Sequence, residues 1–277
     1  HTRLKQFGPD VLISTGWQSR SQVQAVQAAR KLGVPIVVRG ESSAMQPRTV
    51  LKKLLHRIYL GRFRACLAIG KANRDFYRAA GIPDSRIFDA PYFVENRRFT
   101  GDENRAERVR LRKQMNIQEQ DFCFIYSGKL IEKKRVRSLL EALRIVTERE
   151  ENSFRVHMLV VGEGEQKQEL QDFANRHALP VIFQGFVNQS GMPSMYRVAD
   201  CLLLASDYGE TWGLVVNEAM ASGLPAIVSD RAGCGPDLIR QGETGFTYPF
   251  GDVSALAGYM VQLAQNPDSA KKMGAKA

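Results

Sequence analysis

Two acidic residues in the last third of the chain have types and a spacing that suit chemistry. Glu210 and Glu218 stand eight positions apart. Glu210 follows an apolar run, Cys201 to Ala205, that predicts a buried strand, and Glu218 falls where a helix is predicted to begin. In an open α/β sheet, ligands bind beyond the carboxyl ends of the parallel strands. The two carboxylates are therefore predicted to face a ligand at that edge of a sheet.

The residues between the two carboxylates suit an anion. Trp212, Gly213, Leu214 and Val215 lie where the predicted helix opens, and backbone N–H groups at a helix start bind anions. Gly213 removes a side chain where a ligand would approach the backbone. Glu218 in a first helical turn would suit the helix dipole and could accept two hydrogen bonds from a diol. The alternative for each carboxylate alone is a helix cap or a salt bridge.

Basic residues follow an earlier predicted strand at 122–126. Gly128, Lys129 and Lys134 come directly after it, in a loop that could close over a phosphate group. A leaving group that gathers negative charge needs such stabilisation. Gly162 follows another predicted strand, at 156–161, and begins a Gly-Glu-Gly turn of the kind that is usually structural. A lysine cluster alone is more often a solvated surface, so this reading depends on the acidic pair.

The elements that would position these residues form two βα series, which predict an α/β fold with parallel sheets. The first series has strands expected at 10–14, 35–39, 65–69 and 86–90, with helices near 20–32, 49–60 and 71–80. The second has strands expected at 121–126, 154–161, 181–185, 200–205 and 225–228, with helices near 135–149, 164–177, 191–199, 216–222, 235–240 and 252–265. We therefore expect a domain at 1–100, a linker and lead-in helix at 101–120, and a second domain at 121–277.

The net charge of +10 is concentrated in the first domain, where residues 1–100 hold 18 Lys and Arg against 6 Asp and Glu. Its densest part is residues 48–64, where Leu51, Leu54, Leu55, Ile58 and Tyr59 recur at helical spacing among basic residues. This pattern predicts a basic amphipathic helix. Two interpretations stay open: a helix that faces the core with a solvated basic face, or docking on an anionic membrane surface or acidic acceptor. No recognised motif accompanies the charge to favour nucleic acid.

Cysteine usage and composition narrow the class of protein. The 277 residues are 44% hydrophobic and 25% charged, typical of a globular protein. The four cysteines are widely spaced and form no CxxC pair, which suits buried thiols in a reducing cytoplasm. The sequence has no Asp-x-Asp and no His cluster at ligand spacing, so we expect no metal site.

Several segments in a fixed order resemble family 4 of the retaining glycosyltransferases, which have the GT-B fold. The acidic pair is one of these segments, and the others are 127–134, 159–164, 184–187, 199–202, 233–239 and 242–245. The resemblance is close across 121–277 and looser across 1–120. It implies two Rossmann-type domains facing across a cleft. The first appears incomplete, because the glycine-rich opening loop of the family has no counterpart here.

The resemblance also implies roles for individual residues. Glu210 would sit beside the donor sugar, Lys129 and Lys134 would clamp the diphosphate, and Glu218 would grip the ribose hydroxyls. Gly162 and the backbone around Gly185, Phe186 and Val187 would lie near the nucleotide. Lys129 stands where Arg is common, and Trp212 stands where Phe is usual. Arg39 and Glu41 occupy a place where many members carry a His, so they are the candidates on the acceptor side.

The implied function is transfer of a sugar from a nucleoside-diphosphate sugar to a hydroxyl acceptor, with a lipid-linked or cell-envelope glycan as one class of acceptor. The implied location is the cytoplasm, with a peripheral place at the inner face of the membrane. No cofactor is expected. The alternative is a non-catalytic module that binds a nucleotide-sugar or a partner. A nucleotide-sugar epimerase of related fold is a third option.

Overall fold

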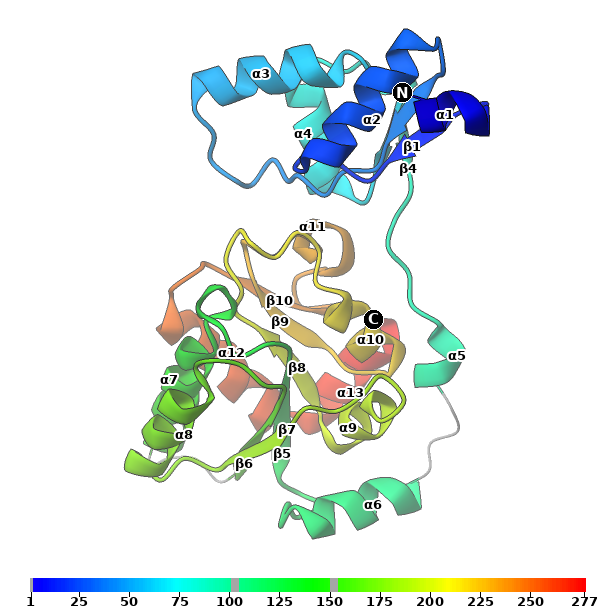
Figure 1. The fold of residues 1–277 in the computed structure, drawn as a ribbon. Coiled ribbons are helices and arrows are strands. Elements are labelled where there is room, and N and C mark those ends of the chain that lie inside the picture. Colours follow the sequence, from blue (N-terminus) through cyan, green and yellow to red (C-terminus); the bar gives the residue numbers. More distant parts are fainter. Residues whose placement is uncertain (1, 101–104, 150–153) are drawn as a thin grey trace. The chain divides into compact units, whose positions relative to one another are not determined.

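The computed structural model describes residues 2–100, 105–149 and 154–277. The chain divides into two compact units, His1–Tyr92 and Phe93–Ala277. Each unit holds one sheet whose strands all pair in parallel (Figure 1). The α/β class predicted from the two βα series is therefore confirmed.

The first unit is built on a four-stranded sheet in the order β1-β2-β3-β4. Its elements, in chain order, are α1 (Thr2–Phe7), β1 (Leu12–Ser14), α2 (Arg20–Lys31), β2 (Ile36–Val38), α3 (Val50–Leu60), β3 (Ala65–Ala68), α4 (Lys71–Ala79), η1 (Asp84–Arg86) and β4 (Ile87–Asp89). The strands and the helices α2 to α4 fall within the predicted ranges. Local signals explain their limits, since Ser19 and Gln22 form a capping box at the start of α2.

Helix α3 buries only part of its apolar side chains in the core of this unit. Leu51, Leu54, Leu55 and Ile58 are 53–66% exposed, whereas Leu60 is fully buried. Tyr59 is partly buried against the same core as Leu60. The expectation of a core-facing apolar stripe was therefore wrong, because the helix packs through its other side. The helical spacing places the exposed basic residues Lys52 and Arg57 on either side of this stripe.

The second unit has a six-stranded sheet in the order β10-β9-β8-β5-β6-β7. Its strands are β5 (Phe122–Ser127), β6 (Val156–Val161), β7 (Val181–Gly185), β8 (Cys201–Leu204), β9 (Ala226–Ser229) and β10 (Gly245–Tyr248). From β5 the chain moves outward through β6 and β7, then returns to β8 on the other side of β5 and moves outward again. In a doubly wound sheet this reversal, between β5 and β8, is the place where ligands bind.

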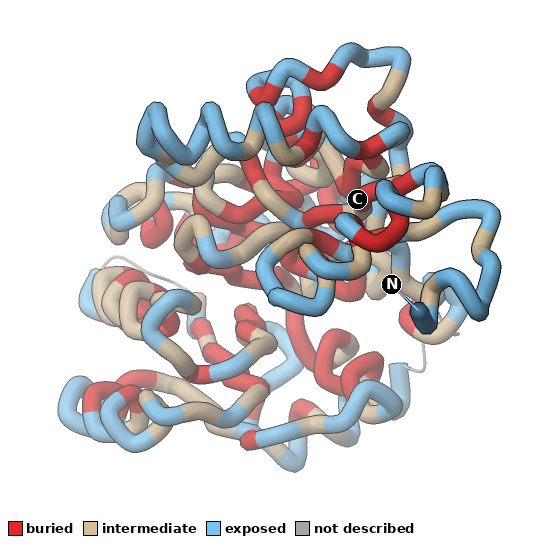
Figure 2. The backbone as a smooth tube through the Cα atoms, turned by 45° about the horizontal axis from the view of Figure 1, so that its top comes forward, coloured by how far each residue is buried: buried red, intermediate tan, exposed pale blue. Residues whose placement is uncertain are grey.

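Helices cover both faces of this sheet (Figure 1). Those of the second unit are α5 (Asn96–Phe99), α6 (Arg105–Gln114), α7 (Val136–Thr147), α8 (Lys167–Arg176), α9 (Met192–Val198), α10 (Leu214–Ala221), α11 (Gly235–Leu238), α12 (Val253–Gln265) and α13 (Pro267–Lys276), with the short η2 (Glu132–Lys134). Side chains of α7, α8 and α12 share one core cluster with one face of the strands. Buried residues, red in Figure 2, run through the interior, and exposed residues lie mainly on the surrounding helices and loops.

Among the described residues, six elements were not predicted from the sequence, namely α1, α5, β10, α13 and the short η1 and η2. Strand β10 is short and mixed in polarity, so it lacks the apolar run that marks the other strands. The start of α10 was also placed too late, at residue 216, whereas the helix begins at Leu214. Residues 101–104 of the predicted linker lie outside the described residues.

The charge-rich segment before β5 packs closely on the second unit. Arg112 of α6 is only 2% exposed, and its guanidinium lies 3.2 Å from the Asp200 carboxylate. Arg108 binds the other oxygen of Asp200 at 2.6 Å. The same carboxylate accepts a hydrogen bond of 2.8 Å from the Cys123 backbone at the start of β5. This network fixes α6 to the entrance of the sheet.

Candidate functional site

Three glycines predicted to lie near a nucleotide meet at the carboxyl edge of the second sheet. The Gly128 N–H donates to the Val161 carbonyl at 3.0 Å, and the Gly162 N–H donates to the Gly185 carbonyl at 2.8 Å. A Cβ on Gly162 would stand 1.9 Å from the Gly128 carbonyl oxygen. The loops after β5, β6 and β7 therefore touch backbone to backbone, which only glycine allows at this crossing.

The structure brings Lys134 and Glu210 together across the switch between β5 and β8. Lys134, in η2 after β5, donates from Nζ to the Glu210 Oε2. The Ser206 hydroxyl donates to the same oxygen at 3.0 Å. The side chains of Lys134 and Glu210 are 18% and 14% exposed, so water screens the pair less than it would at the surface. A partly buried basic and acidic pair thus stands where a ligand is expected.

Lys129 is placed differently from Lys134. Its side chain is exposed, and no acidic side chain in the described ranges forms an ion pair with it. Its carbonyl accepts a 2.9 Å hydrogen bond from the Tyr126 hydroxyl, which anchors the loop. The two lysines predicted to act together therefore share a loop, but only Lys134 contacts a carboxylate.

Glu218 is a buried carboxylate held by two donors. It is 6% exposed. The Tyr196 hydroxyl donates to Oε2 at 2.8 Å and the Gln189 amide donates to Oε1 at 3.2 Å. Burial, followed by the Glu218 charge, raises the pKa of Tyr196 well above its usual value, so this hydroxyl stays protonated as a donor. The Phe99 ring packs on Tyr196 with centroids 6.0 Å apart.

The helix that carries Glu218 begins two residues earlier than the sequence predicted. Because α10 starts at Leu214, Glu218 lies in its second turn, and the helix dipole contributes less to this carboxylate than predicted. Gly213 precedes the helix with φ of 108°, a backbone conformation that glycine adopts readily. Leu214 is 40% exposed and Val215 is partly buried.

Trp212 supports the loop more than it lines a pocket. Its side chain is 5% exposed, and its indole N–H donates to Asn217 at 2.8 Å. The loop after β9 holds the same segment from the other side. The Gly233 N–H donates to the Glu210 carbonyl and the Cys234 N–H donates to the Trp212 carbonyl, both at 3.0 Å. Phe186, by contrast, is 77% exposed beside the partly buried Val187.

In the first unit, Arg39 and Glu41 follow β2, and both contact Tyr92, which follows β4. The Arg39 guanidinium lies 4.5 Å from the centre of the Tyr92 ring, within the range of a cation–π contact. The Tyr92 hydroxyl donates to Glu41. Burial and the hydrogen bond to Glu41 raise the pKa of Tyr92. The two predicted acceptor-side residues are therefore brought together, with a tyrosine that the sequence did not single out.

Two further features of the described residues concern metal ligands and the length and polarity of the helices. Within residues 2–100, 105–149 and 154–277, no group of three or more His, Cys, Asp or Glu side chains could hold a metal ion. Over the same ranges, each helix is too short or too polar to span a bilayer.

Residues that the sequence did not reveal include Tyr196, Gln189 and Ser206. They come from α9, from the loop after β7 and from the end of β8, so only the folded chain brings them to the two glutamates. A buried carboxylate requires hydrogen-bond donors. This general rule predicts that Glu218 has partners, but no pattern in the sequence identifies which residues they are.

Comparison with solved structures places the fold among GT-B glycosyltransferases. The Anabaena protein HepE, crystallised in complex with UDP, has a TM-score of 0.81 and 17% identity, with 99% of this chain and 75% of that chain covered. Sucrose-phosphate synthase from Thermosynechococcus elongatus has a TM-score of 0.77 and 19% identity, with 99% and 69% covered. The predicted fold class is therefore confirmed.

The chain belongs to the family described as glycosyl transferases group 1, whose sequence profile matches residues 107–277. It is 30% identical to N-acetyl-alpha-D-glucosaminyl L-malate synthase of Bacillus anthracis over 210 residues, which cover 75% of this chain and 49% of that protein. It is 32% identical to D-inositol 3-phosphate glycosyltransferase of Streptomyces scabiei over 178 residues, which cover 61% and 40%. The chain spans about half the length of the curated relatives it matches.

Proposed function

We propose that this chain acts as a retaining glycosyltransferase of family 4. It transfers a sugar from a nucleoside-diphosphate sugar to a hydroxyl of a glycan or a lipid-linked acceptor. Membership in glycosyl transferases group 1 supports this proposal. So does the fold of HepE, a protein that has been crystallised with UDP and with UDP-glucose.

The observation that carries the proposal is the meeting of Lys134 and Glu210 at the switch between β5 and β8, with Glu218 buried eight positions further along the chain. Lys134, assisted by Lys129, binds the diphosphate, and the glycine-lined loops let the nucleotide approach the backbone. The N–H groups at the start of α10 add to the positive potential. Glu218 accepts hydrogen bonds from the ribose, and the backbone around Phe186 lines the base.

Glu210 acts on the donor sugar. When the diphosphate binds Lys134, Glu210 loses its ion pair and keeps the hydrogen bond from Ser206. The carboxylate can then orient a sugar hydroxyl and stabilise positive charge at the anomeric carbon. The bond from this carbon to the diphosphate oxygen breaks, and a bond from the acceptor oxygen forms on the same face. The acceptor proton leaves with the diphosphate. Basic side chains supply the stabilisation that a metal supplies in other transferases.

The acceptor side is proposed to involve Arg39, Glu41 and Tyr92. The exposed apolar stripe of α3, flanked by Lys52 and Arg57, is proposed to rest on an anionic lipid surface at the cytoplasmic face. Leu51, Leu54, Leu55 and Ile58 would enter the headgroup region, and the basic side chains would pair with lipid phosphates.

Calorimetry and transfer assays test the proposal. The affinity for the nucleotide, UDP or GDP, should be the same in the presence and in the absence of EDTA. Lys134→Ala should weaken binding by about 1.5–3 kcal/mol, the scale of a charge-assisted hydrogen bond. The exposed Lys272→Ala on α13 is the control and should leave affinity unchanged. Binding that disappears on chelation would contradict the metal-free mechanism.

Glu210→Gln separates catalysis from binding. It should lower kcat about 10²–10³-fold with little loss of donor affinity, because the interaction is strongest in the transition state. NMR of the product should show the anomeric configuration of the donor. Donor binding without transfer to any hydroxyl would favour the non-catalytic module, and an inverted product would contradict the retaining mechanism.

A further inference from the structure

A second basic site lies at the other end of the first sheet from Arg39 and Glu41. A cavity of about 360 Å³ is lined by four arginines, Arg30, Arg62, Arg64 and Arg86. Arg30 lies in the last turn of α2, and Arg62 and Arg64 lie between α3 and β3. Arg86 ends η1 just before β4. The cavity therefore sits at the amino ends of β2, β3 and β4, whereas Arg39 and Glu41 follow the carboxyl end of β2.

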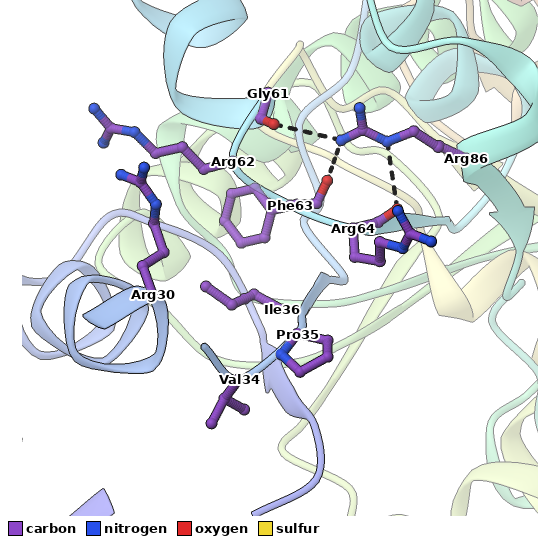
Figure 3. Close-up of a pocket in the computed structure, with 9 residues that line it drawn as sticks. All are labelled: Arg30, Val34, Pro35, Ile36, Gly61, Arg62, Phe63, Arg64 and Arg86. Atoms are coloured by element: carbon purple, nitrogen blue, oxygen red, sulfur yellow. Dashed lines mark hydrogen bonds between the residues drawn. The ribbon is translucent and has the colours of Figure 1, made fainter. Parts of the chain in front are cut away.

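Arg86 forms the structural side of this cavity. Its guanidinium donates to the carbonyls of Gly61, Phe63 and Arg64, with distances of 3.5 Å to Gly61 and 3.3 Å to Arg64. These bonds fix the turn that carries Arg62 and Arg64. In the view of Figure 3, Arg30 and Arg62 lie on one side of the Phe63 ring, and Arg64 and Arg86 lie on the other.

The remaining three arginines have no acidic counterpart. The lining contains no Asp or Glu, and in the described part of the chain no ion pair joins Arg30, Arg62 or Arg64 to a carboxylate. Helices α2 and α3 both end here, and a helix C-terminus carries roughly half a negative charge. Two such termini together offset about one of the four arginine charges, so the cavity keeps a net positive charge.

The chemistry of the lining selects the anion. Guanidinium groups donate paired, planar hydrogen bonds that match phosphate oxygens. The floor, with Ile36 and Phe63, is apolar and buried, so water competes less on that side. Known ligand pockets begin at roughly 300 Å³, which leaves room for a phosphate with part of its ester.

We propose that this cavity binds a phosphate group through Arg30, Arg62 and Arg64, at a site separate from the donor edge. The phosphate belongs either to a small phosphorylated molecule or to the headgroup of a lipid, since α3 leads directly into the turn at Arg62. The inference does not depend on donor binding in the second unit.

Side-chain NMR of the full chain tests this site. The arginine Nε–H signals of residues 30, 62 and 64, assigned by single Arg→Lys variants, are followed during titration with inorganic phosphate. The titration is repeated in a Lys129→Ala, Lys134→Ala background, which removes the two basic groups proposed to bind phosphate at the donor edge. The three signals should shift with one common dissociation constant. If UDP does not bind in the calorimetry experiment, the proposed function is contradicted. The phosphate titration of the three arginines still tests this site independently.

A triple variant and a charge-matched control complete the test. Arg30→Gln, Arg62→Gln and Arg64→Gln together should weaken phosphate binding at least tenfold, measured by phosphorus NMR line broadening. Arg86 stays in place because it holds the turn. The control combines Arg3→Gln, Lys5→Gln and Arg20→Gln, which are exposed on α1 and α2, and it should bind like the unaltered chain. Equal phosphate affinity in both variants would overturn the proposal.

Vesicle sedimentation identifies the source of the phosphate. Vesicles of phosphatidylcholine with and without phosphatidate are mixed with the unaltered chain, the triple variant and the control. If the triple variant alone loses its preference for phosphatidate, the ligand is a lipid headgroup. If phosphate binding is lost but vesicle binding matches the control, the ligand is a soluble phosphorylated molecule.

Discussion

Glu218 is 6% exposed, so its carboxylate has lost most of its hydration. A buried carboxylate is tolerated only when donors replace the lost hydration. Tyr196 and Gln189 supply one hydrogen bond to each oxygen. Under the proposed function, a ribose bound at Glu218 would share these oxygens with the two existing donors, and Tyr196 would orient the carboxylate before and during binding.

Tyr196→Phe removes the stronger donor without changing the shape of the side chain. We expect the free energy of unfolding to fall by about 1.5–3 kcal/mol, because a hydrogen bond to a buried charge is lost. Urea unfolding measures this change, and calorimetry should show weaker UDP binding. Tyr259→Phe is the control, since its hydroxyl bonds to Gln241 at an exposed position. Equal losses in the two variants would mean that the bond to Glu218 has no special weight.

At the scale of elements, the loops after β5 and β6 depend on contact between backbones. A Cβ on Gly162 would stand 1.9 Å from the carbonyl oxygen of Gly128, and a Cβ on Gly164 would stand 2.2 Å from that of Leu130. Neither neighbour is a flexible side chain that can move aside. The short Gly-Glu-Gly turn therefore fixes the distance between two loops of the candidate site.

Gly162→Ala should lower the free energy of unfolding by about 3 kcal/mol or more, through the backbone clash and the positive φ of 144°. The matched control is Gly258→Ala within α12, where a Cβ would meet nothing within 4 Å. That change should raise stability by about 0.5–1 kcal/mol, as expected for glycine in a helix interior. Urea unfolding of both variants checks the contrast, and similar values would contradict the crossing described here.

Helix α3 offers a comparison between its two faces. Leu60→Ala should cost about 2–5 kcal/mol because this side chain is fully buried. Leu55→Ala, at a site 55% exposed, should change stability by less than about 0.5 kcal/mol. It should also weaken sedimentation with anionic vesicles if the stripe rests on lipid. A large loss of stability in Leu55→Ala would mean that the stripe is covered by protein.

The sequence was sufficient for elements whose limits are set locally. Apolar runs predicted β1 to β9. The sequences Gly33-Val-Pro35 and Gly81-Ile-Pro83 each stop a helix with a glycine and a following proline, and they mark the ends of α2 and α4. The face of α3 that packs inward could not be read, because apolar residues occur on both sides of this helix and the choice depends on the sheet beneath. Tyr196 and Gln189 reach Glu218 only through the tertiary fold, so no local pattern predicted them. The roles given to Lys129, Lys134, Glu210 and Glu218 stay predictions.

At the scale of the whole molecule, buried thiols make the stability sensitive to alkaline pH. Burial raises the pKa of Cys66 to about 11 and that of Cys123 to about 12, from an ordinary 9.0. Cys201 and Cys234 are raised for the same reason. In the unfolded chain the thiols release their protons above pH 9, whereas the folded chain retains them. The stabilisation is therefore complete below pH 9 and is lost as pH rises toward 11 and 12.

Unfolding free energies measured at pH 8, 9, 10 and 11 should fall progressively across this range. Cys123→Ala removes one contributing thiol. When each protein is compared with its own value at pH 8, the unfolding free energy of the variant should fall less steeply with pH than that of the unaltered chain. A parallel slope in the variant would show that other groups cause the alkaline loss. In the folded state, the four thiols should also react slowly with a thiol reagent at pH 8, since all four are buried.

The packing of Phe99 on Tyr196 has a consequence for how such proteins can be recombined. Phe99 lies before β5, yet its ring supports the tyrosine that holds Glu218. A gene fusion that exchanges the first unit and joins the chains after Tyr92 keeps Phe99 with its own tyrosine. A fusion joined after Thr100 imports a foreign residue beneath Tyr196. Crossovers between relatives are therefore expected to survive more often when they fall at the earlier junction, so the boundary between inherited modules lies ahead of α5.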